Sequence, residues 1–196
     1  MPKRPDPARR IVDSALALAA RQPWRRTSLA DIAAEAGMPI LAVHDVYRSK
    51  AAILDAFRRR VDAEILAGAG ADPGERPRDR LFDTIMRRFD ALAAHKDAVR
   101  ELTRGAAGDP SALRAAPGLL QSMIWMLEAA GVDASGWRGL ARAHLLGCLY
   151  ASVLRVWLED DSPDMTRTMA VLDRRLRGAA RWLGIDGTAA AGEAAA

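Results

Sequence analysis

Apolar residues recur at helical spacing along almost the whole chain, and this feature constrains the fold more than any other. In the stretch 7–20, Ile11, Ala15 and Leu18 fall on one face of a helix, and similar stretches follow toward the C-terminus. No segment shows the alternation of apolar and polar residues that a half-buried strand requires. Alanine and leucine, both strong helix formers, dominate the composition. The sequence therefore predicts an all-α protein of roughly nine helices.

One segment interrupts this pattern and predicts a domain boundary. Residues 68–77 (GAGADPGERP) concentrate glycine and proline between two helical stretches. We predict a head over residues 1–67 and a body, folded as a helical bundle, over residues 76–184. The end of the chain, residues 185–196, is rich in alanine and glycine and is predicted to be disordered.

Basic residues are concentrated in the head. Residues 1–60 contain 12 Lys and Arg and 6 Asp and Glu, whereas residues 61–196 contain 17 and 19. A basic head on a nearly neutral body indicates that the head alone binds a polyanion. A solvated basic surface that binds nothing would have the same composition, so charge by itself leaves both interpretations open.

Several other kinds of site have no support in the sequence. The single cysteine, Cys148, cannot form an internal disulfide or a multi-cysteine zinc site, and it is expected in a buried helix as a small apolar residue. The three histidines are scattered, so no metal and no cofactor are predicted. There is no Gly-rich phosphate loop and no nucleophile elbow, so an enzyme is not expected. No apolar run reaches about 18 residues, so no membrane span is predicted, and a reducing cytoplasm is the expected compartment.

Three short helical stretches and a longer one at the start of the chain predict a helix-turn-helix. The second and third helices are expected within residues 28–46, with Thr27 as the N-cap of the second and Asp31 in its first turn. Gly37 lies at the expected turn, where a residue without a Cβ accepts a left-handed backbone most easily. Pro39 is expected in the first turn of the third helix, which such a unit offers to the major groove of DNA.

Residues 10–54 resemble the DNA-binding head of transcription regulators of the tetracycline-repressor (TetR) family. The resemblance is carried, in order, by Ile11 and Ala15, Thr27-Ser28, Asp31-Ile32-Ala33, Ala36-Gly37, Tyr47, Ser49-Lys50 and Ile53-Leu54. It implies that Thr27 caps the second helix and contacts a phosphate, that Lys50 contacts a phosphate, and that Tyr47 packs the third helix against the first. The full set of DNA-binding positions that it implies is Thr27, Ser28, Pro39, Ile40, Leu41, Ala42, His44, Asp45, Tyr47 and Lys50.

The predicted third helix departs from the family pattern. The family usually has Ser or Thr where Pro39 stands and Tyr where His44 stands, so few side chains here can hydrogen-bond to base edges. The apolar residues 40–42 could contact thymine methyl groups, and His44 and Asp45 are the main polar candidates. Either the head reads DNA largely by methyl contact and shape, or it has lost DNA binding.

The same resemblance implies a body that dimerises through its last two helices and encloses a ligand pocket. Small residues recur every four positions at Gly139, Ala143, Gly147 and Ala151, and such a row lets another helix approach closely. The predicted dimer interface comprises Gly139, Ala143, Gly147, Ala151, Leu172 and Leu176, and the alternative for the row is close packing inside one subunit. The predicted pocket wall comprises Phe82, Met86, Phe89, Met123, Trp125, Met126, His144 and Trp157, each of which could instead be ordinary core.

Two functions follow from these resemblances. The first is a homodimeric transcription regulator, a repressor whose binding to a palindromic operator in duplex DNA is relieved by a small apolar ligand in the body. The second comes from residues 149–176, which resemble the C-terminal half of the ubiquinone-biosynthesis accessory family. That family shares the fold, but its head no longer reads DNA and its body holds an isoprenoid or another lipid.

Overall fold

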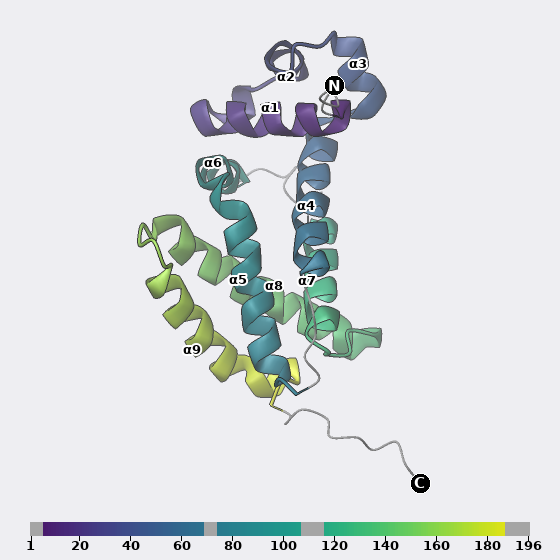
Figure 1. The fold of residues 1–196 in the computed structure, drawn as a ribbon. Coiled ribbons are helices and arrows are strands. Elements are labelled where there is room, and N and C mark those ends of the chain that lie inside the picture. Colours follow the sequence, from purple (N-terminus) through teal and green to yellow (C-terminus); the bar gives the residue numbers. More distant parts are fainter. Residues whose placement is uncertain (1–5, 69–73, 107–115, 187–196) are drawn as a thin grey trace. The chain divides into compact units, whose positions relative to one another are not determined.

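A computed structural model of the chain describes residues 6–68, 74–106 and 116–186 (Figure 1). Within these ranges every regular element is helical, with nine α-helices and one short 3-10 helix. The predicted all-α class is therefore confirmed. None of these helices is both long and apolar enough to cross a lipid bilayer. The predicted disordered end, residues 185–196, lies almost entirely outside the described residues.

The chain forms two compact units from interleaved segments. The head unit comprises Met1–Val61 and Leu92–Gly118, and the body unit comprises Asp62–Ala91 and Leu119–Ala196. These units differ from the predicted domains, because a segment far along the chain completes the head unit. Glycine and proline content predicted a break that falls between two helices, but it could not reveal which later helix belongs to the head unit.

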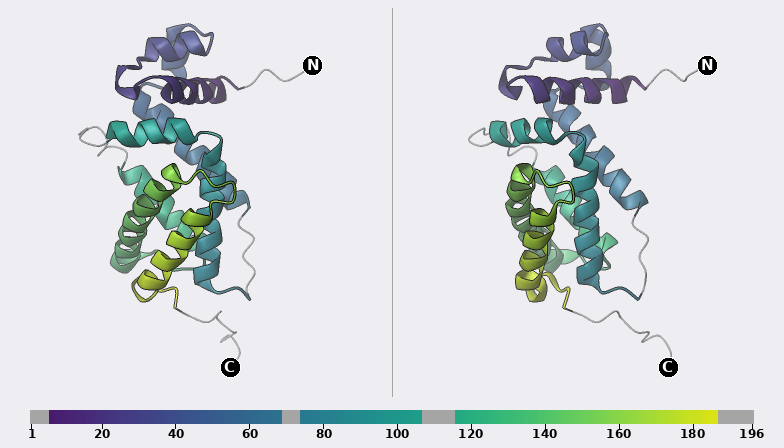
Figure 2. Two further views of the ribbon diagram at one scale, coloured as in Figure 1. Left: turned by 90° about the vertical axis from the view of Figure 1, so that its left-hand side faces the viewer. Right: turned by 60° about the vertical axis from the view of Figure 1, so that its left-hand side comes forward.

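The head unit is built from short helices around a small apolar core (Figures 1 and 2). Its elements are α1 (Pro7–Arg21), η1 (Trp24–Arg26), α2 (Leu29–Glu35), α3 (Ile40–Val46), the first turns of α4 (Lys50–Ala67), and α6 (Lys96–Ala106). The predicted apolar face of the first helix is confirmed, since Ile11, Ala15 and Leu18 are all buried. Helix α4 begins after Ser49, whose hydroxyl accepts a hydrogen bond from the Ala52 N–H at 3.1 Å.

Helix α6 belongs to the head unit because it holds the segment between α1 and α2. The Trp24 N–H donates to a Glu101 carboxylate oxygen at 3.0 Å, and the Arg25 guanidinium donates to the Gly105 carbonyl at 3.1 and 3.3 Å. Helix α6 also packs along α1. The hydrogen bonds from Trp24 and Arg25 to α6, together with the packing of α6 on α1, thus hold η1, the element that leads into the helix-turn-helix.

The body unit is a bundle in which four helices each bury one face. They are α5 (Pro77–Ala93), α7 (Ala116–Ala129), α8 (Gly136–Glu159) and α9 (Thr166–Leu183). The last residues of α5 and the first residues of α7 are counted with the head unit. Its largest fully buried side chains are Leu81, Ile85, Phe89, Met123, Met126, Leu127, Leu146, Trp157 and Leu172. Phe89 stacks on Tyr150 and on Trp157, with ring centroids 5.5 and 5.4 Å apart. Helices α8 and α9 run antiparallel, side by side (Figures 1 and 2).

A single carboxylate organises the turn between α8 and α9. One oxygen of Asp160 accepts hydrogen bonds from the N–H and hydroxyl of Thr168 at 2.8 and 2.7 Å, and the other accepts from the N–H and hydroxyl of Ser162 at 3.2 and 2.6 Å. Burial alone would raise the pKa of Asp160, but these four bonds outweigh it and hold the pKa well below its usual value. The carboxylate therefore ties the end of α8 to the first turn of α9.

Candidate nucleic-acid interface

The start of α2 is fixed by a capping box. The Ser28 hydroxyl accepts a hydrogen bond from the Asp31 N–H at 3.1 Å, and the Asp31 carboxylate accepts one from the Ser28 N–H at 2.8 Å. These bonds, the backbone one first, lower the pKa of Asp31. The predicted place of Asp31 in the first turn is confirmed, but the cap is Ser28. The prediction that Thr27 caps this helix is wrong, because Thr27 lies one residue too early.

The turn after α2 has the geometry that the sequence predicted. Gly37 adopts φ +60°, in the left-handed region. The Gly37 N–H donates to the Ala34 carbonyl and the Met38 N–H to the Ala33 carbonyl, each at 3.0 Å, which is the hydrogen-bond pattern of a Schellman C-cap. The Arg10 guanidinium, from α1, donates to the Ala36 carbonyl at 2.5 Å. Together these bonds set the path from α2 into α3.

Two predicted phosphate-contacting residues make internal contacts in the head unit. Thr27 is 2% exposed, and its hydroxyl donates to the Pro23 carbonyl at 3.3 Å and accepts from Gln22 at 3.1 Å. The Lys50 ammonium donates to the Trp24 and Thr27 carbonyls at 2.5 and 2.7 Å and lies 4.4 Å from the centroid of the Trp24 ring. Lys50 thus holds the segment before α2 in place, and its phosphate contact stays a prediction.

Helix α3 turns a stripe of two apolar and two polar side chains outward. Val43 is fully buried and anchors the helix, whereas Ile40 and Leu41 are 55% and 67% exposed. His44 and Asp45 lie one turn further along the same exposed face, with His44 Nδ1 3.9 Å from an Asp45 carboxylate oxygen. Residues four apart share a helix face, so these four side chains form one outward stripe. We call Ile40, Leu41, His44 and Asp45 the α3 stripe.

The remaining predicted DNA-binding positions lie beside this stripe. Pro39 precedes α3 as its N-cap rather than lying in its first turn, and it makes no side-chain cap hydrogen bond. Ala42 is half-buried. Tyr47 ends α3, where its N–H donates to the Val43 carbonyl at 2.7 Å, and burial raises the pKa of its hydroxyl. Arg48, which the sequence analysis did not single out, is exposed directly after α3.

The helix-turn-helix has a counterpart among known protein families. Residues 11–57 match the family model described as bacterial regulatory proteins, tetR family. The match covers most of α1, all of η1, α2 and α3, and the first turns of α4. Over this segment, the chain is similar to TetR-type proteins. The predicted resemblance over residues 10–54 is therefore confirmed, with nearly the same limits.

Solved structures of TetR-type proteins share the fold over most of the chain. The TetR transcriptional regulator from Nitrosomonas europaea is 25% identical, with a TM-score of 0.71, covering 89% of this chain and 98% of that one. The TetR transcriptional regulator from a Rhodococcus species is 18% identical (TM-score 0.62, 87% and 95%), and that from Streptomyces coelicolor is 19% identical (TM-score 0.61, 92% and 83%). The last two likenesses concern the fold alone. No curated protein matches the chain.

A second family model matches the body unit. Residues 119–182 match the family model described as COQ9. This range covers most of α7, all of α8 and most of α9. It contains residues 149–176, for which the sequence analysis gave the rival resemblance. The two family matches thus divide between the helix-turn-helix and the C-terminal helices.

The predicted pocket wall is only partly buried in the body unit. Phe89, Met123, Met126 and Trp157 lie in its core, and Phe82 and Met86 are half-buried. Two of the predicted residues lie outside this core. Trp125 is 44% exposed because it lies between the inward-facing Met123 and Met126, and His144 is exposed because it follows buried Ala143 by one position.

A buried polar cluster in the body unit was missed by the sequence analysis. The Arg88 guanidinium donates to one oxygen of Asp62, and the Ser122 hydroxyl donates to the other at 2.7 Å. Arg88 also lies over the Tyr150 ring, with its Cζ 5.6 Å from the centroid, and burial raises the pKa of the Tyr150 hydroxyl. The Arg88 Nε has no hydrogen-bond partner among the described residues. The sequence did contain a signal for this cluster. Arg88 lies three residues after Ile85, which places a charged residue on the apolar face of an amphipathic helix.

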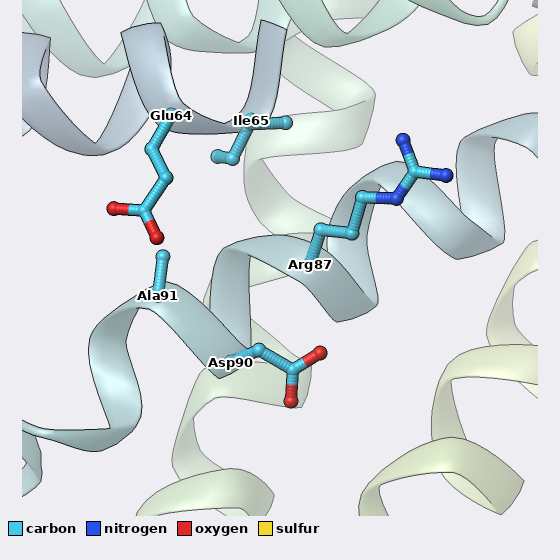
Figure 3. Close-up of a pocket in the computed structure, with 5 residues that line it drawn as sticks. All are labelled: Glu64, Ile65, Arg87, Asp90 and Ala91. Atoms are coloured by element: carbon cyan, nitrogen blue, oxygen red, sulfur yellow. The ribbon is translucent and has the colours of Figure 1, made fainter. Parts of the chain in front are cut away.

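The described surface pocket lies between α4 and α5 (Figure 3) and is not the predicted ligand site. It encloses about 280 Å³. Glu64 and Ile65 come from α4, and Arg87, Asp90 and Ala91 come from α5. The Glu64 carboxylate points toward Ala91, and the Arg87 guanidinium donates to the Gly68 carbonyl. The polar residues around it are exposed, so it lacks the apolar wall of a typical small-molecule site.

Most of the predicted dimer residues pack within one chain. Gly139, Ala143, Leu172 and Leu176 are buried in the body unit, and a Cβ at Gly139 would meet the Ala134 carbonyl carbon at 1.9 Å. The row of small residues therefore serves internal packing at these positions, which corrects the prediction for them. Of the predicted interface residues, Ala151 is exposed and Gly147 is half-buried. A different row on α8 is exposed, namely Trp137, Leu140, His144, Cys148 and Ala151. The expectation that Cys148 is buried is also wrong.

Proposed function

We propose that this chain is a TetR-type, DNA-binding transcription regulator that acts as a homodimer, with a body that binds a small apolar ligand. The observation that carries the proposal is the α3 stripe. It follows a helix-turn-helix whose turn is fixed by Gly37 and Arg10, and a second helix of such a unit normally enters the major groove. The charge of the head supports the proposal, with 12 Lys and Arg against 6 Asp and Glu in residues 1–60.

The proposal is tested by measuring affinity for a labelled random-sequence duplex across a salt series. Phosphate contacts release counterions, so the logarithm of the affinity should fall steeply and linearly with the logarithm of the salt concentration. Arg48→Gln should reduce that slope by about 2, since it removes one exposed cation next to α3 from each subunit of the dimer. Arg167→Gln removes an exposed cation at the start of α9 and should leave the slope unchanged. A chain with no affinity at low salt would refute the DNA-binding function.

The effector is proposed to bind in the body, beside the buried polar cluster. Phe89, Met126 and Trp157 provide apolar and polarisable surface there, and the Arg88 Nε–H is a buried donor without a partner. Leaving such a donor unpaired costs about 1–3 kcal/mol. A ligand with an acceptor oxygen at one end would remove that cost. Since Asp62 already balances the charge of Arg88, a neutral acceptor such as a carbonyl fits better than a carboxylate.

The role of the ligand as an inducer follows from linkage. If the ligand and the operator favour different arrangements of the dimer, each must weaken the other by the same factor. Organic extraction of the purified chain followed by mass spectrometry would identify any retained molecule. Adding that molecule back should lower the affinity for DNA, and an unchanged affinity would contradict its role as inducer.

The COQ9 match favours one other candidate function, a lipid-binding accessory protein whose head does not read DNA. The α3 stripe fits this candidate as well, because only His44 and Asp45 offer hydrogen-bonding groups to base edges. The lipid extract and the DNA-binding assay together distinguish the two functions. A lipid in the extract together with no DNA binding at low salt would favour the accessory function, and salt-dependent DNA binding would favour the regulator.

A further inference from the structure

Helix α3 lacks the side chains that usually read purines. Its sequence, ILAVHDV, contains no Arg, Lys, Asn or Gln, the residues that make paired hydrogen bonds with guanine or adenine in the major groove. Pro39, directly before α3, has no side-chain donor. Among the exposed positions of α3, hydrogen bonding to bases is therefore left to His44 and Asp45, which lie next to each other.

Two large aliphatic side chains occupy the rest of the outward stripe. Ile40 and Leu41 are 55% and 67% exposed in the first turn of α3, where residues of a recognition helix approach the bases. Val43, in the same helix, is fully buried, so the helix already contributes an apolar anchor to the core of the head unit. Exposing two more aliphatic side chains side by side is unfavourable unless a partner covers them.

Resting on the proposed DNA-binding function, we propose that Ile40 and Leu41 determine sequence specificity by packing against the 5-methyl groups of thymine. Thymine is the standard base that presents a methyl group in the major groove. Duplex DNA is the occupant that fits the surroundings, because the stripe belongs to the basic part of the chain and exposed Arg48 lies three residues after its last member, Asp45. The operator half-site then contains A·T pairs where the first turn of α3 meets the groove.

Deoxyuridine substitution isolates the methyl group, since uracil keeps every hydrogen-bonding group of thymine. The duplex to use is one obtained by in vitro selection from a random pool with the full chain. Burial of one methyl-sized group contributes about 0.8 kcal/mol, so replacing a contacted thymine by deoxyuridine should weaken binding about fourfold. Replacing the symmetry-related thymine as well should weaken it about fifteenfold. Thymines outside the half-sites should tolerate the change.

Variants of the chain assign the contact to its residues. Leu41→Ala or Ile40→Ala should weaken binding to the thymine duplex. The variant should also lose the sensitivity to deoxyuridine at one position, because the amino-acid substitution and the base replacement remove the same contact. Leu66→Ala is the matched control, an exposed leucine in α4 of the body unit that should keep full sensitivity. A third duplex adds a test of the methyl alone. With a C·G pair at that position, the unaltered chain should bind the duplex that carries 5-methylcytosine about fourfold more tightly than the duplex that carries cytosine. The variant that has lost its sensitivity to deoxyuridine should bind both duplexes equally.

The outcomes separate this inference from the function on which it rests. Sensitivity to deoxyuridine that disappears in Leu41→Ala or Ile40→Ala establishes methyl readout. A selected duplex that tolerates deoxyuridine at every position overturns it and leaves the DNA-binding function standing, as does salt-dependent binding with no selected sequence. Absence of any DNA binding at low salt overturns both.

Discussion

At the scale of residues, the head shows which roles a sequence can reveal. Gly37 was predicted from its residue type, because a turn with positive φ favours glycine strongly, and its φ of +60° agrees. The cap of α2 was assigned to the wrong one of two adjacent hydroxyl residues. Thr27 and Ser28 are both good caps, and only the backbone path from η1 decides that Ser28 faces the helix end. The carbonyl contacts of Lys50 depend on the same path.

Replacing Gly37 with alanine should destabilise the chain through its backbone. A Cβ at this position would have room, since its nearest contact is the Arg10 guanidinium at 3.9 Å. The left-handed conformation itself should cost about 1–2 kcal/mol of unfolding free energy, measured by urea denaturation. Gly178→Ala, in the exposed interior of α9 where a Cβ meets nothing, should instead stabilise by up to about 1 kcal/mol. Equal effects of the two changes would contradict this account of the turn.

At the scale of elements, the turn between α8 and α9 yields a pH prediction. The pKa of Asp160 is lowered in the folded chain, so its contribution to stability is fully present above the unfolded value of about 3.9 and is lost as the pH falls through the folded pKa. Asp160→Asn should lower the unfolding free energy at pH 7 by about 2–3 kcal/mol. It should also flatten the acid side of a plot of melting temperature against pH. An unchanged acid limb would show that this carboxylate does not hold the turn.

Helical periodicity predicted the elements better than it predicted their faces. The all-helical class and the inward side of α1 followed from spacing alone. Trp125 and His144 lie outside the core, and spacing could not show this, because it defines a stripe but does not say which of two neighbouring stripes faces inward. The polar cluster of Asp62 and Arg88 was missed for a related reason, since charged residues are assigned to the surface unless a partner on another helix is known.

At the scale of the whole molecule, the proposed regulator requires two copies of the chain. The exposed row on α8 includes Trp137, 76% exposed, and Leu140, 46% exposed, and a twofold contact would cover both copies of such a row. Leu140→Glu should therefore convert a dimer into a monomer in analytical ultracentrifugation. Leu119→Glu changes another exposed leucine, in α7, and should leave the dimer intact. A monomeric unaltered chain, or a dimer that tolerates Leu140→Glu, would contradict this interface.

The central claim is that two copies of α3 meet adjacent turns of one duplex. In vitro selection of a random duplex pool with the full chain, followed by sequencing, tests it most directly. The account predicts enrichment of an inverted repeat whose half-site centres lie about 10 base pairs apart, or a multiple of that distance. A pool that stays random after repeated rounds, or a selected site without twofold symmetry, would contradict it.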